Sequence, residues 1–368
     1  MSSTRLQAST TPLARAFDVA LLDLDGVVYI GRRAVPDAAA HLAAARAQGM
    51  RLAFVTNNAA RPPEAVAERL RAMSIPAEPA EVITSAQAAA HYLAERLTAG
   101  AAVLVVGTDG LYQALTERGL RPVSSADDDP AAVVQGYSPT LTWAQLAEGA
   151  VAIRRGLPWI ATNADRTVPS ERGPLPGNGS MVAALRHTTG ATPTVTGKPD
   201  PTMHRESVQR SGARHPLVVG DRLDTDIAGA AAVGCPSLLV LTGVTTPAEL
   251  LAAPPGMRPS FVAPDLSGLL RRPPAPTLAE GAVMETRLGG WAAAAGSAGR
   301  LVLRRARVVS ASAGDGPASA GEPAGDDGLD PLRALCAISW RRGDADERAR
   351  CVAGDEAAGK ALASLDLG

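Results

Sequence analysis

Four groups of polar residues in this sequence have the types and the spacing needed to bind a charged ligand. Three of the groups directly follow an apolar run that predicts a strand, and the lysine follows the short run Thr194 to Thr196. Ligands of open α/β sheets bind outside the carboxyl ends of the strands, so we expect the four groups to meet there. The groups are Asp23 and Asp25 with Gly26; Thr56, Asn57 and Asn58; Lys198 after Gly197; and Asp221, Thr225 and Asp226 after Gly220.

Together these groups supply several carboxylates, a hydroxyl and one ammonium. Hard oxygen ligands of this kind suit Mg²⁺, which takes one or two carboxylates and keeps water or substrate phosphate in its other positions. A phosphoryl group is therefore the ligand that we expect. An aspartate nucleophile can approach an anionic phosphate only when cations offset the repulsion, and both Mg²⁺ and Lys198 supply positive charge.

Lys198 stands out because lysine is rare in this chain. Of 36 basic residues only Lys198 and Lys360 are lysine, and the rest are arginine. This bias, with abundant Ala, Gly and Pro, indicates a GC-rich coding sequence in which a retained lysine is expected to be needed. Lys360 lies in an Ala-rich stretch and fits chance, whereas Lys198 lies in the segment Thr196 to Asp200 between polar residues.

The elements that must position these residues alternate between apolar strands and helices. A strand at Val19 to Asp25, a helix at Pro36 to Gln48 and a strand at Arg51 to Val55 form one βαβ unit. The alternation continues as far as Leu241 and predicts an α/β fold with doubly wound parallel sheets. The other predicted helices are 62–73, 85–97, 110–118, 142–154, 179–189, 201–211 and 225–233, and the other strands are 102–106, 131–135, 159–162, 217–220 and 237–241.

The four groups, in their order and context, resemble the four motifs of the haloacid dehalogenase (HAD) superfamily. The closest resemblance is to the NagD-like phosphatases, and it covers residues 17–270. It implies a HAD core at 18–87 and 188–272, with an α/β type II cap domain inserted at 88–187. The 141 residues between Thr56 and Lys198 are too many for a loop and enough for such a domain. The matching segments are Asp23 to Val27, Thr56 to Asn58, Gly197 to Pro199 and Gly220 to Asp226.

The resemblance implies a two-step hydrolysis of a phosphomonoester. Asp23 would attack phosphorus and form an aspartyl phosphate, and Asp25 would act first as an acid and then as a base. Asp23, Asp221 and the backbone carbonyl of Asp25 would hold Mg²⁺. The other implied roles are phosphate binding by Thr56, Asn57 and Lys198, and support behind the metal ligands by Thr225 and Asp226.

Three segments resemble family loops near the substrate. Gly26 to Gly31 resembles the flap hairpin that follows the nucleophile. Tyr137 lies in a predicted substrate-facing loop of the cap, although it could instead simply pack the cap. Thr162 to Asp165 resembles the family's Thr-Asn-Pro-Asp segment with alanine in place of proline. For Asn163 and Asp165 a turn role and a substrate contact both stay open.

The C-terminal extension, residues 273–368, carries fewer signals. Leu301 to Val309 predicts a strand, and Asp330 to Trp340 and Asp355 to Leu365 predict helices. The segment 311–328 is rich in Gly and has no large apolar residue, which predicts a disordered link. We expect the extension to serve docking or oligomerisation rather than a second active site, so a homo-oligomer stays open.

Composition excludes several classes of partner. With 36 basic and 37 acidic residues the net charge is -1, which lacks the basic surface that nucleic acid or an anionic membrane attracts. No apolar run is long enough to span a membrane, and residues 1–17 lack the apolar segment of a secretory signal, which predicts a disordered leader. Three widely spaced cysteines predict reduced thiols in a cytoplasmic protein.

The residues and the resemblance together predict a Mg²⁺-dependent phosphatase for a small phosphorylated metabolite. The chain with its extension resembles actinobacterial enzymes that act on glycerol 3-phosphate, which is therefore the first expected substrate. Phosphoglycolate, a sugar phosphate and a nucleoside monophosphate stay open.

Two other classes are disfavoured. Hydrolysis of a C-halide or phosphonate bond fits poorly, because dehalogenases of this superfamily lack the second aspartate and need no metal, whereas Asp25 and Asp221 are both present. A metabolite-binding or scaffolding protein on a HAD core is the non-enzyme alternative. Every catalytic position is intact, which argues against it.

Overall fold

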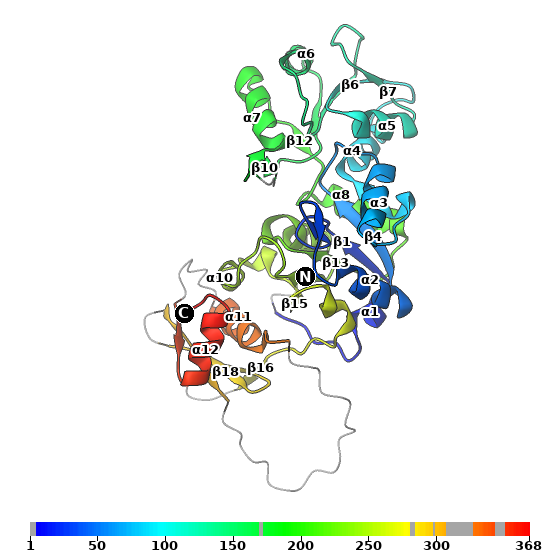
Figure 1. Ribbon diagram of the computed structural model, residues 1–368. Coiled ribbons are helices and arrows are strands. Elements are labelled where there is room, and N and C mark those ends of the chain that lie inside the picture. The colour runs from blue at the N-terminus through cyan, green and yellow to red at the C-terminus, as the bar shows by residue number, and fades with distance from the viewer. Residues whose placement is uncertain (1–4, 169–171, 280–283, 297–298, 307–326, 343–349) are drawn as a thin grey trace. The chain divides into compact units, whose positions relative to one another are not determined.

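The computed structural model describes residues 5–168, 172–279, 284–296, 299–306, 327–342 and 350–368 (Figure 1). The chain divides into two compact units. The first unit is made of Met1–Ala20, Ala40–Arg51 and Leu217–Gly368, and the second of Leu21–Ala39 and Leu52–Pro216. In the described part of the chain, none of the helices combines the length and the apolar character needed to cross a membrane.

A six-stranded sheet carries most of the residues that the sequence places at strand ends. Its strand order is β15-β14-β13-β1-β4-β5, and the pairs β4–β5, β13–β14 and β14–β15 are parallel. Every residue of β1, β14 and β15 is buried, as expected for a parallel sheet covered on both faces. The strands are β1 Val19–Leu22, β4 Arg51–Thr56, β5 Val82–Thr84, β13 Pro216–Gly220, β14 Ser237–Val240 and β15 Phe261–Ala263.

The helices between these strands follow the predicted pattern. They are α2 Ala38–Ala47, α3 Pro63–Ala72, α8 Pro201–Ser211 and α9 Ala228–Ala232. Helix α8 begins where the Asp200 carboxylate accepts a hydrogen bond from the Thr202 N–H at 2.9 Å, and it ends at Gly212 with a φ of 59°. Strands β5 and β15 were not predicted, because three residues are too few for a periodic signal.

The second unit contains a further parallel sheet with strand order β12-β9-β8-β6-β7. We call it the cap sheet because most of its strands lie in the predicted cap. Its strand β6 sends alternate side chains to two separate apolar clusters. Val103 and Val105 join α4 and α5, whereas Leu104 and Val106 join α6 and α7. Helices therefore pack on both faces of this sheet. The elements are α4 Ser85–Ala94, β6 Ala102–Val106, α5 Asp109–Glu117, β7 Arg121–Val123, β8 Ala132–Gln135, α6 Trp143–Arg154, β9 Trp159–Ala161, α7 Asn178–Thr189 and β12 Thr194–Val195.

Strand β12 lies outside the predicted cap boundaries. It pairs with β9 in parallel, with Thr194 opposite Ile160, so the cap sheet continues beyond residue 187. The family resemblance had placed this short run in the core, whose second segment was expected to begin at residue 188.

The C-terminal extension forms a third sheet with strand order β16-β17-β18-β19-β20. The first four strands are antiparallel, and β20 pairs with β19 in parallel. The predicted strand at 301–309 is β19 as far as Arg305, and residues 307–309 lie outside the described residues. So does the predicted disordered link, except for Asp327 and Gly328. The elements are β16 Thr277–Ala279, β17 Glu285–Leu288, β18 Trp291–Ala295, β19 Leu301–Arg305, α11 Asp330–Arg342, β20 Cys351–Ala353 and α12 Glu356–Ser364.

The extension shares an apolar core with the first unit. Leu332, Leu335 and Ile338 of α11 are fully buried in one cluster with Leu239 and Leu250. Directional bonds accompany this packing: the Trp340 Nε1–H donates to the Leu250 carbonyl at 3.1 Å. Helix α10, Pro247–Leu251, therefore lies directly against α11.

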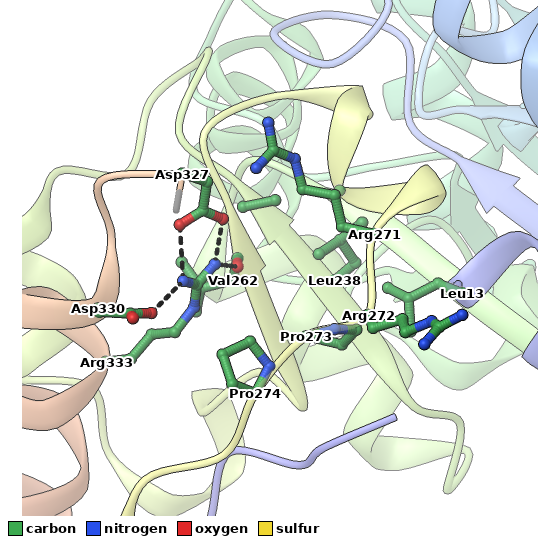
Figure 2. Close-up of a pocket in the computed structure, with 12 residues that line it drawn as sticks. Leu13, Leu238, Val262, Arg271, Arg272, Pro273, Pro274, Asp327, Asp330 and Arg333 are labelled. Atoms are coloured by element: carbon green, nitrogen blue, oxygen red, sulfur yellow. Dashed lines mark hydrogen bonds and ion pairs between the residues drawn. The ribbon is translucent and has the colours of Figure 1, made fainter. Parts of the chain in front are cut away.

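A buried arginine fixes the start of α11 (Figure 2). The Arg333 guanidinium donates to the Val262 carbonyl at 2.7 Å and pairs with Asp327 at 2.5 Å and Asp330 at 3.0 Å. It lines a pocket with Arg271 of the segment that leads into the extension. Its side chain is only 5% exposed, so the pairing carboxylates are needed to compensate the buried charge.

Residues 5–17 differ from the predicted disordered leader. Leu6 and Leu13 are buried, and Leu13 begins the short helix α1, Leu13–Ala16. The Gln7 N–H donates to the Ser260 carbonyl at 2.9 Å. This order was not predictable, because two isolated leucines make no periodic pattern and their partners lie far along the chain.

Candidate active site

Asp23 and Lys198 meet at the end of β1. The Lys198 Nζ lies 2.5 Å from the Asp23 Oδ1 and 3.4 Å from the Val55 carbonyl oxygen. The Lys198 side chain is 3% exposed and that of Asp23 is 13% exposed. A buried ammonium is retained only beside a compensating charge, so this pair holds an ionised carboxylate at the strand end.

Asp25 lies in a tight turn that follows. Gly26 has a φ of 88°, which glycine adopts without strain, and its N–H donates to the Tyr29 carbonyl at 2.8 Å. The Tyr29 hydroxyl donates to the Asp25 carboxylate. The pKa of the Asp25 carboxyl is raised overall, although part of the residue is exposed. Burial of the carboxyl raises this pKa, and it outweighs the charges of Arg69 and Lys198 and the Tyr29 hydrogen bond, which lower it.

The strand end at β4 supplies Thr56 and Asn57. Thr56 is buried at the last position of the strand, and its hydroxyl oxygen accepts a hydrogen bond from the Asn58 N–H at 3.1 Å. The Asn57 carboxamide oxygen accepts from the Lys198 N–H at 2.9 Å. The Ser85 hydroxyl donates to the Asn57 carbonyl at 2.6 Å. Thr56, Asn57 and Lys198 are therefore brought together, as the sequence predicted.

Two of the three predicted cap residues reach the same place. The Asn163 amide donates to the Asn57 carbonyl at 2.7 Å, and the Asp165 carboxylate accepts from the Asn57 amide at 3.2 Å. Tyr137 is half-buried just after β8. Among the described residues, no polar contact joins the Tyr137 hydroxyl to the other predicted site residues.

The strand end at β13 supplies Asp221, Thr225 and Asp226. Asp221 is fully buried, and its carboxylate accepts from the Val244 N–H at 2.7 Å. Residues Leu223–Ile227 form a wide helical turn in which the Ile227 N–H donates to the Arg222 carbonyl at 3.2 Å. This turn carries Thr225 and buries Asp226, whose carboxylate accepts from the Arg222 N–H at 3.2 Å.

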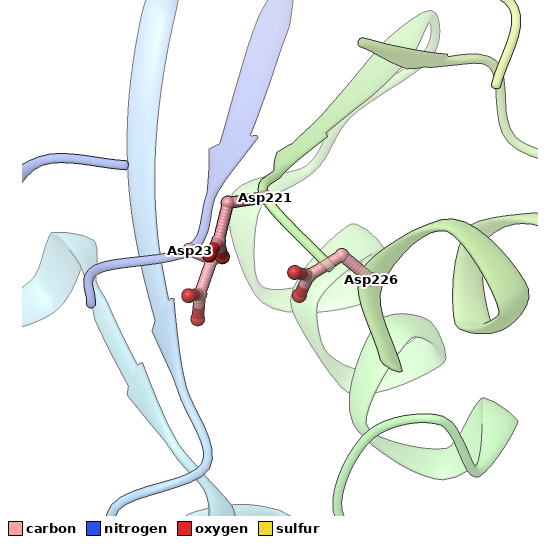
Figure 3. A group of neighbouring side chains, drawn as sticks. All are labelled: Asp23, Asp221 and Asp226. Atoms are coloured by element: carbon pink, nitrogen blue, oxygen red, sulfur yellow. The ribbon is translucent and has the colours of Figure 1, made fainter. Parts of the chain in front are cut away.

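Three of these carboxylates form a group (Figure 3). Asp23, Asp221 and Asp226 each offer one oxygen, and these oxygens lie within 4.8 Å of one another. Lys198 compensates one carboxylate, which leaves an excess of negative charge. An all-oxygen donor set with excess negative charge fits Mg²⁺. The Asp226 carboxylate therefore lies close to the other two, as a residue directly behind the metal ligands would.

Two contributors were missed as site residues. Tyr29 was recognised only as part of a flap, and Arg69 was not singled out. The Arg69 guanidinium lies 4.1 Å from the centre of the Tyr29 ring and donates to the Gly31 carbonyl. The signal for Tyr29 was available, because a tyrosine four residues after an acid in a tight turn can reach back to it. Arg69 lies on α3 and carries no such signal.

Two family profiles match the segments that carry these residues. The sequence profile described as haloacid dehalogenase-like hydrolase matches residues 20–121, and the one described as HAD-hydrolase-like matches residues 195–269. With the relatives that follow, these matches show that the chain belongs to the haloacid dehalogenase-like hydrolases. The predicted family is confirmed.

The relatives are named phosphatases. The chain is 44% identical over 364 residues to the D-glycerol 3-phosphate phosphatase of Mycobacterium tuberculosis, covering 96% of each chain. It is 40% identical over 228 residues to the acid sugar phosphatase of Staphylococcus aureus, covering 61% of this chain and 87% of the relative.

Solved structures give the same result. The glycerol phosphate phosphatase of M. tuberculosis in complex with magnesium matches with a TM-score of 0.85 and 42% identity, over 98% of this chain and 100% of the other. The p-nitrophenyl phosphatase from Archaeoglobus fulgidus matches with a TM-score of 0.64 and 31% identity, over 69% of this chain and 98% of the other. These comparisons confirm the α/β HAD fold and the prediction of a phosphatase.

Proposed function

We propose that this chain is a Mg²⁺-dependent phosphatase that hydrolyses glycerol 3-phosphate. The observation that carries the chemistry is the Asp23 carboxylate, which lies 2.5 Å from a buried ammonium and within 4.8 Å of two further carboxylates. The substrate is supported by the M. tuberculosis relative, whose match covers 96% of this chain and therefore extends into residues 273–368.

In the first step, an Asp23 carboxylate oxygen would attack phosphorus in line. The new bond joins that oxygen to phosphorus, and the bond from phosphorus to the glycerol oxygen breaks. The protonated Asp25 carboxyl would give its proton to the departing alkoxide. The surroundings that raise the pKa of Asp25 favour the protonated form that this step needs.

In the second step, water would attack the aspartyl phosphate. Asp25, now ionised, would take a proton from that water, and the bond between phosphorus and Asp23 breaks to release inorganic phosphate. Lys198 stays beside Asp23 in both steps and would stabilise the negative charge of the transferring group. Thr56 and the Asn57 N–H would bind phosphate oxygens, and the contact of the Asn57 side chain with the Lys198 backbone supports this.

Asp23, Asp221 and the backbone carbonyl of Asp25 would hold Mg²⁺, with Asp226 behind these ligands. When bound, the ion would offset the repulsion between the carboxylates and the phosphate. A cytoplasmic location is part of the proposal, and it is supported by Cys235, Cys336 and Cys351, all of which are free thiols.

The test is phosphate release from a panel of phosphomonoesters with and without Mg²⁺. The panel contains glycerol 3-phosphate, phosphoglycolate, a sugar phosphate, a nucleoside monophosphate and p-nitrophenyl phosphate. We expect Mg²⁺-dependent turnover with the highest kcat/KM for glycerol 3-phosphate, and loss of turnover after chelation. A different favourite would contradict the substrate, and no release from any member by folded protein would contradict the enzyme.

A further inference from the structure

The Asn57 side chain holds the backbone of Lys198 from both sides. Its carboxamide oxygen accepts from the Lys198 N–H at 2.9 Å, and its amide donates to the Lys198 carbonyl at 3.2 Å. This pairing fixes where the lysine side chain starts. The Lys198 Nζ then reaches the Asp23 Oδ1 at 2.5 Å. Asn57 therefore determines the position of the ammonium beside the proposed nucleophile.

Two residues of the loop Thr162–Asp165 form hydrogen bonds with Asn57. The Asn163 amide donates to the Asn57 carbonyl at 2.7 Å, and the Asp165 carboxylate accepts from the Asn57 amide at 3.2 and 3.4 Å. Asn163 is 3% exposed, and its carboxamide oxygen accepts from the Asp165 N–H at 3.1 Å. The polar atoms of Asn163 are thus used within the protein, which leaves it poorly placed to bind a substrate hydroxyl.

Further contacts hold the loop itself in place. The amide of Asn178, which is 1% exposed, donates to the Asn163 carbonyl at 2.8 Å. Glycines allow the backbone to approach closely here. A Cβ at Gly197 would lie 2.2 Å from the Thr162 carbonyl oxygen and 2.8 Å from the Asn57 Oδ1, and one at Gly179 would lie 2.2 Å from the Ala164 carbonyl oxygen. These contacts therefore hold the backbone of the loop Thr162–Asp165 in one conformation.

We propose that Asn163 and Asp165 are positioning residues that act through Asn57 on Lys198, and that they do not select the substrate. This proposal rests on the proposed function, because it concerns the same phosphate site. The path runs from the loop to the Asn57 carboxamide, from there to the Lys198 backbone, and from the Lys198 ammonium to Asp23. Since Asp23 and Lys198 serve every phosphomonoester alike, disturbing the path changes turnover for all substrates equally.

The first experiment compares Asn163→Ala and Asp165→Ala with the wild type on glycerol 3-phosphate, phosphoglycolate and p-nitrophenyl phosphate. We expect kcat to fall by about tenfold for each substrate, which is the effect of losing one well-placed hydrogen bond. The ratios of KM between the three substrates should stay as in the wild type. A loss confined to glycerol 3-phosphate, or a selective rise of its KM, would overturn the proposal. Thr188→Ala is the control, because it also removes one hydrogen bond, from the Thr188 hydroxyl to the Ala184 carbonyl on α7, away from Asn57.

Asp165→Asn keeps an oxygen that can accept from the Asn57 amide while it removes the charge. We expect it to retain most of the wild-type kcat on all three substrates. If Asp165→Ala does not fold, Asp165→Asn still tests whether the charge of Asp165 is needed. A loss as large as that of Asp165→Ala would show that the charge acts on substrate directly, and would overturn the proposal.

A double-mutant cycle separates a path through Asn57 from a general loss of structure. Asn57→Ala alone is expected to lower kcat at least as much as Asp165→Ala, and the double variant should lose no more than Asn57→Ala. Additive losses would overturn the proposed path. Failure of the function itself looks different, because the wild type would then release phosphate from none of the substrates.

Discussion

Among substitutions of single residues, we expect that of Asp23 to lower phosphate release the most. Asp23→Asn removes the negative charge that pairs with Lys198, and it removes the carboxylate nucleophile. It keeps the size of the side chain. We expect phosphate release to fall by at least about a thousandfold, because the loss of a covalent nucleophile is among the most costly changes in an enzyme. Circular dichroism checks that the fold is kept. Substantial residual turnover in a folded Asp23→Asn protein would show that another group attacks phosphorus.

We expect Tyr29 to orient Asp25 for protonation of the leaving group. Its hydroxyl donates to Asp25, and Arg69 holds its ring at 4.1 Å. Tyr29→Phe removes the hydrogen bond that orients Asp25 and keeps the ring. Glycerol leaves as a basic alkoxide and needs the proton from Asp25, whereas p-nitrophenolate leaves without help.

The measured quantity is therefore the ratio of kcat values for glycerol 3-phosphate and p-nitrophenyl phosphate. We expect Tyr29→Phe to lower kcat for glycerol 3-phosphate by about tenfold and to change kcat for p-nitrophenyl phosphate little. Tyr112→Phe is a matched control, because this tyrosine lies on α5 away from Asp25. Equal losses on both substrates would contradict the orienting role.

At the scale of elements, Arg333 is expected to secure the start of α11. Its guanidinium is buried between Asp327, Asp330 and the Val262 carbonyl. Arg333→Met leaves the Asp327 carboxylate, 7% exposed, without its main partner, which costs about 3 kcal/mol when a buried pair is broken. Thermal unfolding measures the change in stability. Lys360→Ala breaks a pair whose side chains are 78% and 85% exposed, so the Tm should scarcely move.

The same pair predicts a dependence of stability on pH. Burial alone would raise the pKa of Asp327, but the hydrogen bond and charge of Arg333, the Leu329 N–H and the charge of Arg271 hold it below its usual range. A carboxyl with a lowered pKa in the folded state stabilises the protein above its unfolded pKa, and this stability is lost as the pH falls through the folded pKa. Asp327→Asn should therefore lower the Tm at neutral pH and show a smaller loss of Tm than wild type on acidification. Parallel acid curves for the two proteins would contradict this.

Elements with a strong local pattern were predictable from the sequence. The strand and helix at 102–106 and 110–118 appear as β6 and α5, since apolar periodicity and turn residues act locally. Pairing partners were not predictable, because they depend on distant residues. Thr194–Val195 was recognised as a strand but was placed outside the cap, and the pairing with β9 decides its sheet.

In the candidate site, too, local patterns were predictable from the sequence and contacts between distant residues were not. Asp23, Asp25, Thr56, Lys198 and Asp221 were predicted because each stands directly after a strand-like run or a motif glycine. What the sequence left open was how Asn163 and Asp165 are used, since a turn residue and a substrate ligand look alike in one dimension. Their contacts with Asn57 join two segments that lie more than 100 residues apart in the chain, at separations of 106 and 108 residues.

At the scale of the whole molecule, the extension is part of a shared core rather than a separate appendage. Leu332, Leu335 and Ile338 are buried with Leu239 and Leu250. Burying each large apolar side chain stabilises by roughly 1.5–3 kcal/mol, so three of them approach the total stability of a typical domain, about 5–15 kcal/mol. By contrast, the S. aureus relative aligns to only 61% of this chain while 87% of its own length is covered, so this fold can exist with a shorter chain.

These two facts lead to a prediction for the chain truncated after Arg272. The shorter relative shows that the phosphatase fold does not require an extension, but in this chain α10 and β15 present apolar side chains to α11. We expect residues 1–272 to aggregate or to unfold at a much lower temperature, because truncation exposes that surface. Full-length Trp340→Ala, which removes the bond to the Leu250 carbonyl at 3.1 Å, should lower the Tm by a smaller amount in the same direction. Size-exclusion chromatography, thermal unfolding and phosphate release measure the outcome, and a monomeric 1–272 chain with wild-type Tm and turnover would show that the extension is separable from the catalytic fold.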